Sequence, residues 1–316
     1  MEGISLAAVQ EARRVIAESA ICTPLIQLNF ADRPPEIYLK LENLQPIGSF
    51  KIRGAANAIA HLQPEQLERG VVTASAGNMA QGVAWCARKL GIPCTVIAPA
   101  TAPDAKVSAI ERLGGRVIRV TFDEWWRAFE QRSFPGVEGT FIHAFDDPHV
   151  MAGNGTIALE ILEDVEDVDA VVIPWGGGGL TCGIASVLRE LRPACRVFTA
   201  EVATAAPFAA SLAAGSPTRV EYQPSWVDGI GSKGVFPQMF DRARNLVDGA
   251  LTAELSGVAS ALRHLVQHNH IVAEGAGACP VACALSGTAG RGKIVCIISG
   301  GNLDPTKLAQ ILTARF

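Results

Sequence analysis

The chain has 316 residues, 49% of them hydrophobic and 18% charged, which is enough to bury a core in two domains or in one large domain. Its formal net charge of -4 gives no reason to expect the basic face that binds nucleic acid. No apolar run approaches the roughly 18 residues of a membrane-spanning helix, and charged residues interrupt the first twenty positions. We therefore expect no nucleic-acid partner, no membrane span and no secretory signal.

The eight cysteines form no CxxC pair, and several of them stand in apolar segments. Cysteines in this setting are typical of buried free thiols in a protein that has no disulfide scaffold. Because free thiols persist in reducing compartments, we expect a cytoplasmic protein.

In the first half of the chain, short apolar runs alternate with segments whose apolar residues recur at helical spacing. After residue 79, for example, Ala80, Val83 and Ala87 fall on one helix face, and Gly91 ends the helix. The expected order is strand 71–74, helix 80–90, strand 94–98, a helix that Pro103 opens, strand 116–120, a helix around 125–129 and strand 140–144. Such a run of alternating units predicts a parallel sheet.

The alternation starts again after position 146. We expect strands at 170–174, 196–201 and 293–298, and helices at 156–164, 180–191 and 252–267. Residues 214–236 are rich in Gly, Pro and Ser, have weak periodicity and are expected to form a long surface loop. The predicted fold class is therefore α/β, with two doubly wound α/β domains whose ligands bind at the carboxyl ends of the strands.

A lysine stands between an aromatic and a β-branched residue in the loop predicted for residues 48–54 (GSFKIRG). It could be an ordinary surface lysine whose aliphatic stem lies on apolar neighbours. A lysine amine can also bind a carbonyl compound covalently when its surroundings keep it partly neutral. Lys51 is therefore a candidate nucleophile, and the motif alone leaves both interpretations open.

Two further loops follow predicted strands. Residues 75–79 (SAGNM) lie between a strand and a helix, where Ser75 could be only a helix cap. The same backbone N–H groups at a helix N-terminus also suit a carboxylate. Residues 299–302 (SGGN) follow the last predicted strand and could be an ordinary strand-to-helix turn or part of a site.

Four consecutive glycines at 176–179 separate an apolar strand from a helix. A plain turn needs one or two glycines, and four are costly in conformational entropy. A loop that wraps its N–H groups around a phosphate needs bare backbone at several positions. The spacing matches neither the dinucleotide nor the ATP motif, so the loop indicates a single phosphate.

Taken in order, these loops and four further blocks resemble the fold-type II pyridoxal-phosphate (PLP) enzymes, whose fold is tryptophan synthase β-like. Within that family they resemble the serine/threonine dehydratase and serine racemase group. The matching blocks are TPL at 23–25, LKLEN at 39–43, GSFKIRGA at 48–55, SAGN at 75–78 with AQG at 80–82, AGNGTIA at 152–158, GGGG at 176–179, EGAGA at 274–278 and SGGN at 299–302. The resemblance implies a large PLP-binding domain from residues 1–47 and 147–316, a small mobile domain at 48–146, and a homodimer.

The resemblance also implies roles in binding the cofactor, pyridoxal 5'-phosphate. Lys51 would bind it covalently and take the Cα proton of the substrate, and Phe50 would lie against its ring. Asn78 would donate to or accept from the 3-hydroxyl of the ring, and Ser299 would face the pyridine nitrogen. The phosphate would be held by the backbone N–H groups of four residues, Gly176, Gly177, Gly178 and Gly179.

The small-molecule partner implied is an amino-acid substrate. Its carboxylate would be held by the loop that follows the first strand of the small domain, formed by Ser75, Ala76, Gly77, Asn78 and Met79. The expected reaction is that of an ammonia-lyase. An L-β-hydroxy amino acid, threonine-like or serine-like or bulkier, such as the aryl compound phenylserine, becomes a 2-oxo acid and ammonia.

Three departures from the group's pattern refine these expectations. Racemases carry a serine where this chain has Ala76, so we expect elimination to dominate. Met79 replaces a histidine, which is either neutral or a sign of a more apolar pocket that suits an aryl substituent. Glu201 aligns with a metal-binding acid, but Pro207 stands where a second acid would be expected. We therefore expect no metal site, with Glu201 the weak candidate ligand.

The chain ends soon after the SGGN block, so we expect no regulatory domain and no control by a pathway end product. Two other functions stay open at this stage. One is a serine or other amino-acid racemase on the same fold. The other is a non-catalytic protein that binds a phosphate-bearing ligand, because fold alone does not establish catalysis.

Overall fold

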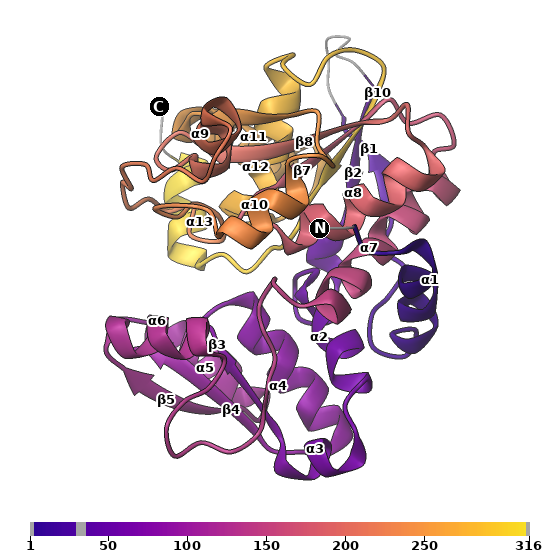
Figure 1. Cartoon of the computed structure of the whole chain (residues 1–316). Helices are drawn as coiled ribbons and strands as arrows, with labels where there is room; N and C mark the ends of the chain where they lie inside the picture. The colour runs from indigo at the N-terminus through magenta and orange to yellow at the C-terminus, as the bar shows by residue number, and fades with distance from the viewer. Residues whose placement is uncertain (1–2, 30–35, 314–316) are drawn as a thin grey trace.

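The computed structural model describes residues 3–29 and 36–313, which form two α/β units, each built around its own sheet (Figure 1). The smaller sheet has the strand order β5-β4-β3-β6, and all its pairings are parallel. Its strands are β3 Val71–Ala74, β4 Cys94–Pro99, β5 Arg116–Val120 and β6 Thr140–Phe141. The helices of this part are α2 Lys51–Ala60, α3 Pro64–Arg69, α4 Asn78–Leu90, α5 Asp104–Arg112 and α6 Phe122–Gln131.

The larger sheet has the order β1-β2-β10-β7-β8-β9, with only the β1–β2 pairing antiparallel among those described. Its strands are β1 Leu25–Gln27, β2 Glu36–Lys40, β7 Ala170–Pro174, β8 Arg196–Val202, β9 Gly249–Ala253 and β10 Lys293–Ile297. The helices around it are α1 Leu6–Val15, η1 Glu42–Leu44, α7 Pro148–Asp164, α8 Gly179–Leu191, α9 Pro207–Ala214, α10 Pro237–Ala243, α11 Leu255–Asn269, α12 Gly275–Leu285 and α13 Pro305–Thr313.

The chain order of these strands places a topological switch in the larger sheet. From β7 the chain continues outward through β8 and β9, whereas β10 returns to the other side of β7. The strand order therefore reverses between β7 and β10. In open α/β sheets, ligands bind in the crevice at the carboxyl ends of the strands at such a point.

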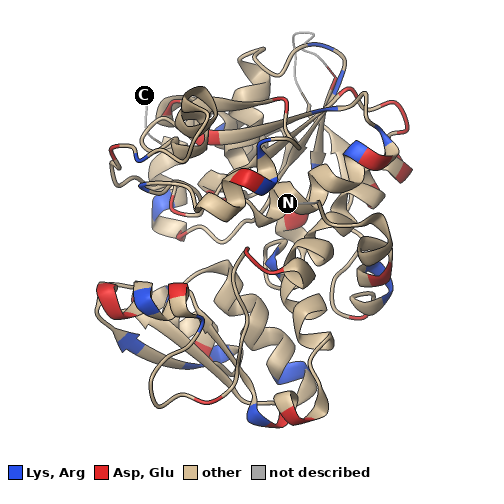
Figure 2. Cartoon of the chain, in the orientation of Figure 1, with Lys and Arg blue, Asp and Glu red and all other residues tan. Residues whose placement is uncertain are grey.

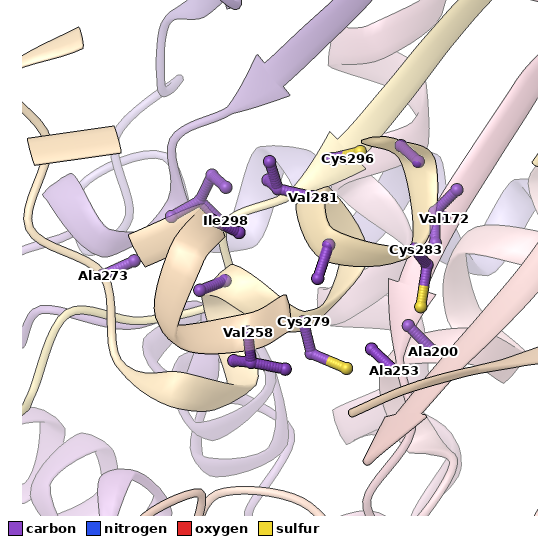
Figure 3. Packing of buried hydrophobic residues seen from close by; sticks show 14 of the residues in the cluster. Val172, Ala200, Ala253, Val258, Ala273, Cys279, Val281, Cys283, Cys296 and Ile298 are labelled. Atoms are coloured by element: carbon purple, nitrogen blue, oxygen red, sulfur yellow. The ribbon is translucent and has the colours of Figure 1, made fainter. Parts of the chain in front are cut away.

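The central strands are continuous apolar runs because both faces of each sheet are covered. In β7, Val171 and Ile173 pack toward the core around α7 and α8, while Ala170 and Val172 pack toward α11 and α12. Figure 3 shows part of the second core, where Val172 lies near cysteine side chains of α12. The expected buried free thiols are confirmed at seven of the eight cysteines, and Cys22 is exposed.

The strands predicted in the first half are confirmed, although the one predicted at 140–144 ends after Phe141. The helix predicted at 252–267 is wrong at its start, because Thr252 and Ala253 belong to β9 and α11 begins at Leu255. That strand exists through its pairing with β8, which places Leu251 opposite Ala200. A local pattern contains no information about such a partner.

One predicted loop is partly helical, and one predicted helix begins earlier than expected. Residues 51–54 form the first turn of α2, so Lys51 is the first residue of a helix. The helix predicted from 156 begins at Pro148, where the Asp147 carboxylate accepts hydrogen bonds from the N–H groups of His149 and Val150. Residues 215–236 contain no helix or strand, as expected, but Val227 and Ile230 in this segment are buried.

Within the described residues, no helix is both long enough and apolar enough to cross a membrane. Figure 2 shows basic and acidic residues interspersed over both parts of the molecule in this view.

Candidate active site

Lys51 lies where the two sheets meet, and its surroundings favour a neutral amine. The Phe50 N–H donates to the Ser299 carbonyl at 3.0 Å, which ties the start of α2 to the end of β10. The Lys51 Nζ donates to the Ala144 carbonyl at 2.7 Å. Burial lowers the pKa of Lys51 to about 8, although the negative charge of Glu274 acts in the opposite direction. Burial therefore favours the neutral amine more than in a free lysine.

The glycine loop follows β7 and leads into α8, whose N-terminus has no side-chain cap. Gly178 has a φ of 89°, which favours glycine. A Cβ at Gly177 would lie 1.9 Å from the Phe145 ring, and a Cβ at Gly178 would lie 2.5 Å from the Trp175 ring. Two aromatic rings of the chain itself therefore require glycine at these two positions, in addition to the phosphate that the sequence predicts. The backbone N–H groups at the start of α8 have no side-chain cap, and groups of this kind suit a phosphate.

Ser299 stands at the same edge of the sheet as this loop. The parallel register pairs Cys296 of β10 with Val172 of β7, so the residues that follow each strand come out side by side. Ser299 is buried, and the adjoining Gly300 bridges to Ser49 just before Lys51. Lys51, Ser299 and the glycine loop therefore converge at the topological switch. An amine, a neutral hydroxyl and a helix N-terminus fit a phosphorylated pyridine aldehyde.

Asn78 is the first residue of α4 and has partners at both ends of its amide. Its Nδ2 donates to the Glu274 Oε1 at 2.9 Å and Oε2 at 3.2 Å, and its Oδ1 accepts from the Asn302 Nδ2 at 2.8 Å. Burial raises the pKa of Glu274 to about 7, and the hydrogen bond from Asn78 partly offsets this. No role was predicted for Glu274 or Asn302 from the sequence, although both residues stand in the EGAGA and SGGN blocks that carry the family resemblance.

Asn78, Glu274 and Asn302 line a cavity of about 80 Å³ between the two α/β units, and Lys51, Ser299 and the glycine loop are not among its lining residues. An ion pair between Lys106 of α5 and Asp228, in the segment before α10, lies at this cavity. Both side chains are partly exposed to solvent. The full lining is Gly77, Asn78, Gln81, Lys106, Asp228, Gly229, Glu274 and Asn302.

The loop 75–79 divides between the cavity and the core. The Ser75 Oγ accepts a hydrogen bond from the Gly77 N–H at 3.2 Å, and a Cβ at Gly77 would meet nothing within 4 Å. Ala76 is half-buried against the small core of Ala98, Ala102 and Val107. This arrangement leaves the Gly77 side of the loop open to a ligand.

Met79 does not line the cavity. Its side chain is 2% exposed and packs in the core of the smaller sheet, which contains Ile52 and Ala55. The expectation that Met79 makes the substrate pocket more apolar therefore loses its structural support. Phe50 is also buried, in the core of the larger sheet, and its ring centroid lies 5.1 Å from the Lys51 Nζ.

Glu201 ends in a structural role. Its Oε1 and Oε2 accept hydrogen bonds from the Phe208 N–H at 3.0 Å and the Ala209 N–H at 2.7 Å, at the start of α9. Burial raises the pKa of Glu201 to about 7, and these two N–H groups partly offset that effect. Among residues 3–29 and 36–313, no group of three or more His, Cys, Asp or Glu side chains is arranged to hold a metal.

A buried ionic network holds the helix that carries Lys51. The Arg53 guanidinium donates to Glu42 at 2.8 Å and to Glu160 at 2.6 Å, and Lys40 pairs with Glu160 at 2.7 Å. All four side chains are buried. Burial acts to lower the pKa of Arg53, but the two carboxylates outweigh it and raise the pKa. The network joins α2 to η1, β2 and α7, and it therefore fixes the position of Lys51 at the start of α2.

Comparison with known sequences identifies relatives over most of the chain. A family model described as pyridoxal-phosphate dependent enzyme matches residues 16–300. The chain is 42% identical over 314 residues to the L-threonine ammonia-lyase of Thermotoga maritima, across 98% of this chain and 78% of that protein. It is 37% identical over 319 residues to the catabolic L-threonine dehydratase of Staphylococcus aureus, across 98% of this chain and 92% of that protein.

Solved structures give the same answer for the fold. Maize serine racemase superposes with a TM-score of 0.87 at 30% identity, covering 98% of this chain and 97% of the racemase chain. The processed form of threonine deaminase isoform 2 from Solanum lycopersicum superposes with a TM-score of 0.85 at 31% identity, covering 98% and 88%.

Proposed function

This chain belongs to the pyridoxal-phosphate dependent enzymes, and from that premise we propose that it is an ammonia-lyase that converts an L-β-hydroxy amino acid to a 2-oxo acid and ammonia. The fold-type II family and the cofactor expected from the sequence are confirmed by the comparisons. The observation that carries the proposal is the half-buried Lys51, whose amine donates to the Ala144 carbonyl, beside Ser299 and the glycine loop. The names of the threonine ammonia-lyase and threonine dehydratase relatives support the reaction type.

In this proposal, four parts of the chain would hold the cofactor. Lys51 would bind it covalently, the N–H groups of residues 176–179 would hold its phosphate, Ser299 would face its ring nitrogen, and Asn78 would hydrogen-bond its 3-hydroxyl. The cofactor supplies an electron sink for the bond broken at Cα, while the protein supplies orientation and proton transfer. Ser299 offers a neutral hydroxyl where a carboxylate would hold the ring nitrogen protonated.

Lys51 is also the proposed base. Burial lowers the pKa of its amine to about 8, close to neutral pH, and a general base is most effective when its pKa lies near the operating pH. Once the substrate amine has taken the place of the Lys51 amine, the freed Lys51 Nζ would take the Cα proton as the Cβ–O bond breaks and the hydroxyl leaves as water. The same ammonium can return that proton to the departing hydroxyl. Hydrolysis of the resulting enamine would then release the 2-oxo acid and ammonia.

The loop 75–79 is the proposed site for the substrate carboxylate, because its N–H groups lie at the N-terminus of α4. We place the small domain at residues 48–146 and the large domain at 1–47 and 147–316. The smaller sheet lies wholly within the first range. Closure of the small domain over the substrate would exclude water from the reacting groups. A homodimer in the cytoplasm stays a prediction from the sequence.

The substrate itself is proposed more broadly, as threonine-like or serine-like or as a bulkier aryl compound. A racemase is the second candidate, which the similarity to maize serine racemase favours. Ala76 favours elimination, because a methyl group cannot exchange a proton with the opposite face of Cα.

A substrate panel tests the proposal. The holoenzyme is incubated with L-serine, L-threonine and L-threo-phenylserine, and both 2-oxo acid and D-amino acid are measured. Release of 2-oxo acid well in excess of D-amino acid is the expected result. Rapid formation of D-serine would favour the racemase. A colourless protein that does not change on addition of PLP would support a non-catalytic binding protein.

A further inference from the structure

Four aromatic rings form a cluster that spans the two parts of the molecule close to Lys51. We call Trp126, Phe129, Phe145 and Phe236 the aromatic cluster. Trp126 and Phe129 belong to α6 over the smaller sheet, whereas Phe236 precedes α10 beside the larger sheet. Phe145 lies on the connection from β6 to α7. The ring centroid of Phe236 lies 5.6 Å from that of Trp126, 5.9 Å from that of Phe129 and 5.5 Å from that of Phe145.

The cluster reaches the reacting groups through Phe145. The residue before it, Ala144, accepts the hydrogen bond from the Lys51 Nζ at 2.7 Å. The Phe145 ring itself lies against Gly177 of the glycine loop. Phe145 therefore contacts the predicted phosphate loop as well as the rings of Phe129 and Phe236, and it follows directly after the residue that holds the lysine amine.

The cluster has both buried and solvent-facing members. Phe129 is 5% exposed and forms its base. Trp126, Phe145 and Phe236 are only half-buried, and the last two pack against the cores of both sheets. His143 also contacts Phe129 and Phe145, with ring centroids 4.4 and 4.8 Å away. Burial lowers the pKa of His143 to about 4, so this neighbour is uncharged at neutral pH. The wall beside Lys51 is therefore apolar, aromatic and incompletely covered.

We propose, on the basis of the ammonia-lyase function above, that the aromatic cluster receives the β-substituent of the substrate and selects an aryl group. Aromatic rings attract one another in offset and edge-to-face arrangements, and the pairs in this cluster are tilted or stacked in that way. An aryl group added to the half-buried rings would extend the same packing. The methyl group of threonine is too small to contact several rings at once.

This assignment replaces the expectation based on Met79, whose side chain lies in the core of the smaller sheet. The rings come from positions 126, 129, 145 and 236, so both sheets contribute to the wall.

The test compares kcat/KM of the holoenzyme for L-threo-phenylserine and for L-threonine, measured by release of 2-oxo acid. We expect the wild-type enzyme to prefer phenylserine by about tenfold or more. Phe236→Ala and Trp126→Ala should each lower the phenylserine-to-threonine ratio by about tenfold. Phe236→Leu removes the ring but keeps an apolar side chain of similar size, so it should fold and should still lower the same ratio.

Tyr222→Ala is the control, because Tyr222 is an aromatic residue that is 39% exposed and has no ring contact among the contacts of the described residues. Its ratio should stay within about twofold of the wild-type value. If threonine is deaminated but the ratio favours threonine, or does not respond to the Phe236 variants, the cluster assignment is overturned and the ammonia-lyase function stands. If no 2-oxo acid forms from any β-hydroxy amino acid, both are overturned.

Discussion

The buried ionic network and the aromatic cluster both contact the surroundings of Lys51, but they are built from opposite kinds of side chain. The network around Arg53 is charged, fully buried and satisfied by direct hydrogen bonds. The aromatic cluster is apolar and half-buried, and it joins parts of the chain on both sheets. Removal of one partner from a buried charged network leaves an unpaired charge and is very costly. Exchange of a half-buried ring costs much less, so the network can fix the lysine while the rings can vary with the substrate.

The largest effect is expected at Lys51, which both groups surround. Lys51→Ala should lower the rate of 2-oxo acid release by at least about a thousandfold, because it removes both the covalent attachment and the base. The visible absorption of the PLP-bound enzyme should also disappear. Lys89→Ala, a surface lysine, is the control and should keep both properties. A variant at position 51 that stays yellow and active would refute the assignment.

The next largest effect is expected in the ionic network, where burial makes the loss of one charged partner costly in stability. Arg53→Met leaves Glu42 and Glu160 without their shared cation, and we expect a loss of about 3–5 kcal/mol in the free energy of unfolding. Urea denaturation of the purified variant measures this loss. Arg13→Ala breaks an exposed pair with Glu163 and should cost about 0–1 kcal/mol. Equal losses in the free energy of unfolding of the two variants would show that burial does not make the network more important for stability than an exposed ion pair.

A third prediction concerns Glu274, a buried acid outside the network. Its pKa is raised from about 4.5 unfolded to about 7 in the folded chain, so the protonated form is favoured on folding. The folded state should therefore lose stability as the pH rises between these two values. Above pH 7 the ionised carboxylate should destabilise it by up to about 3 kcal/mol.

Glu274→Gln removes this titration. Relative to the wild-type protein without cofactor, the variant should gain stability in urea denaturation between pH 5 and pH 8. Glu201 has a similar raised pKa, so Glu201→Gln serves as a parallel measurement far from Asn78. A difference between wild type and Glu274→Gln that does not change with pH would contradict the prediction.

The smallest effect is expected where charge lies at the surface. Lys106 and Asp228 join the two parts of the molecule across the cavity, but both are partly exposed. Lys106→Ala should change the free energy of unfolding by less than about 1 kcal/mol. It should also change kcat/KM for L-threonine by less than about threefold. A much larger effect would mean that this pair, like the Arg53 network, holds the parts together.

Much of the fold could be predicted because it rests on local patterns. The bounds of β3, β5 and β7 agree with those predicted, since each is a short apolar run between turn residues. The start of α11 was wrong, because β9 exists only through its pairing with β8. The helical glycines of α7 were also unexpected. A Cβ at Gly153 would lie 2.4 Å from the Arg53 carbonyl, so close helix packing requires glycine there.

What the sequence by itself determined was the family and the cofactor, because short motifs of special residues keep their meaning without the fold. It also predicted Lys51 as the lysine that binds the cofactor. Only the tertiary structure decided which residues surround that lysine. Asn78 meets Glu274 across 196 positions of the chain, and the aromatic cluster gathers residues from 126 to 236. It also moved Met79 from the expected pocket into a core. Spacing along a chain predicts one face of a helix or strand, but the contacts between faces depend on how the sheets and helices pack.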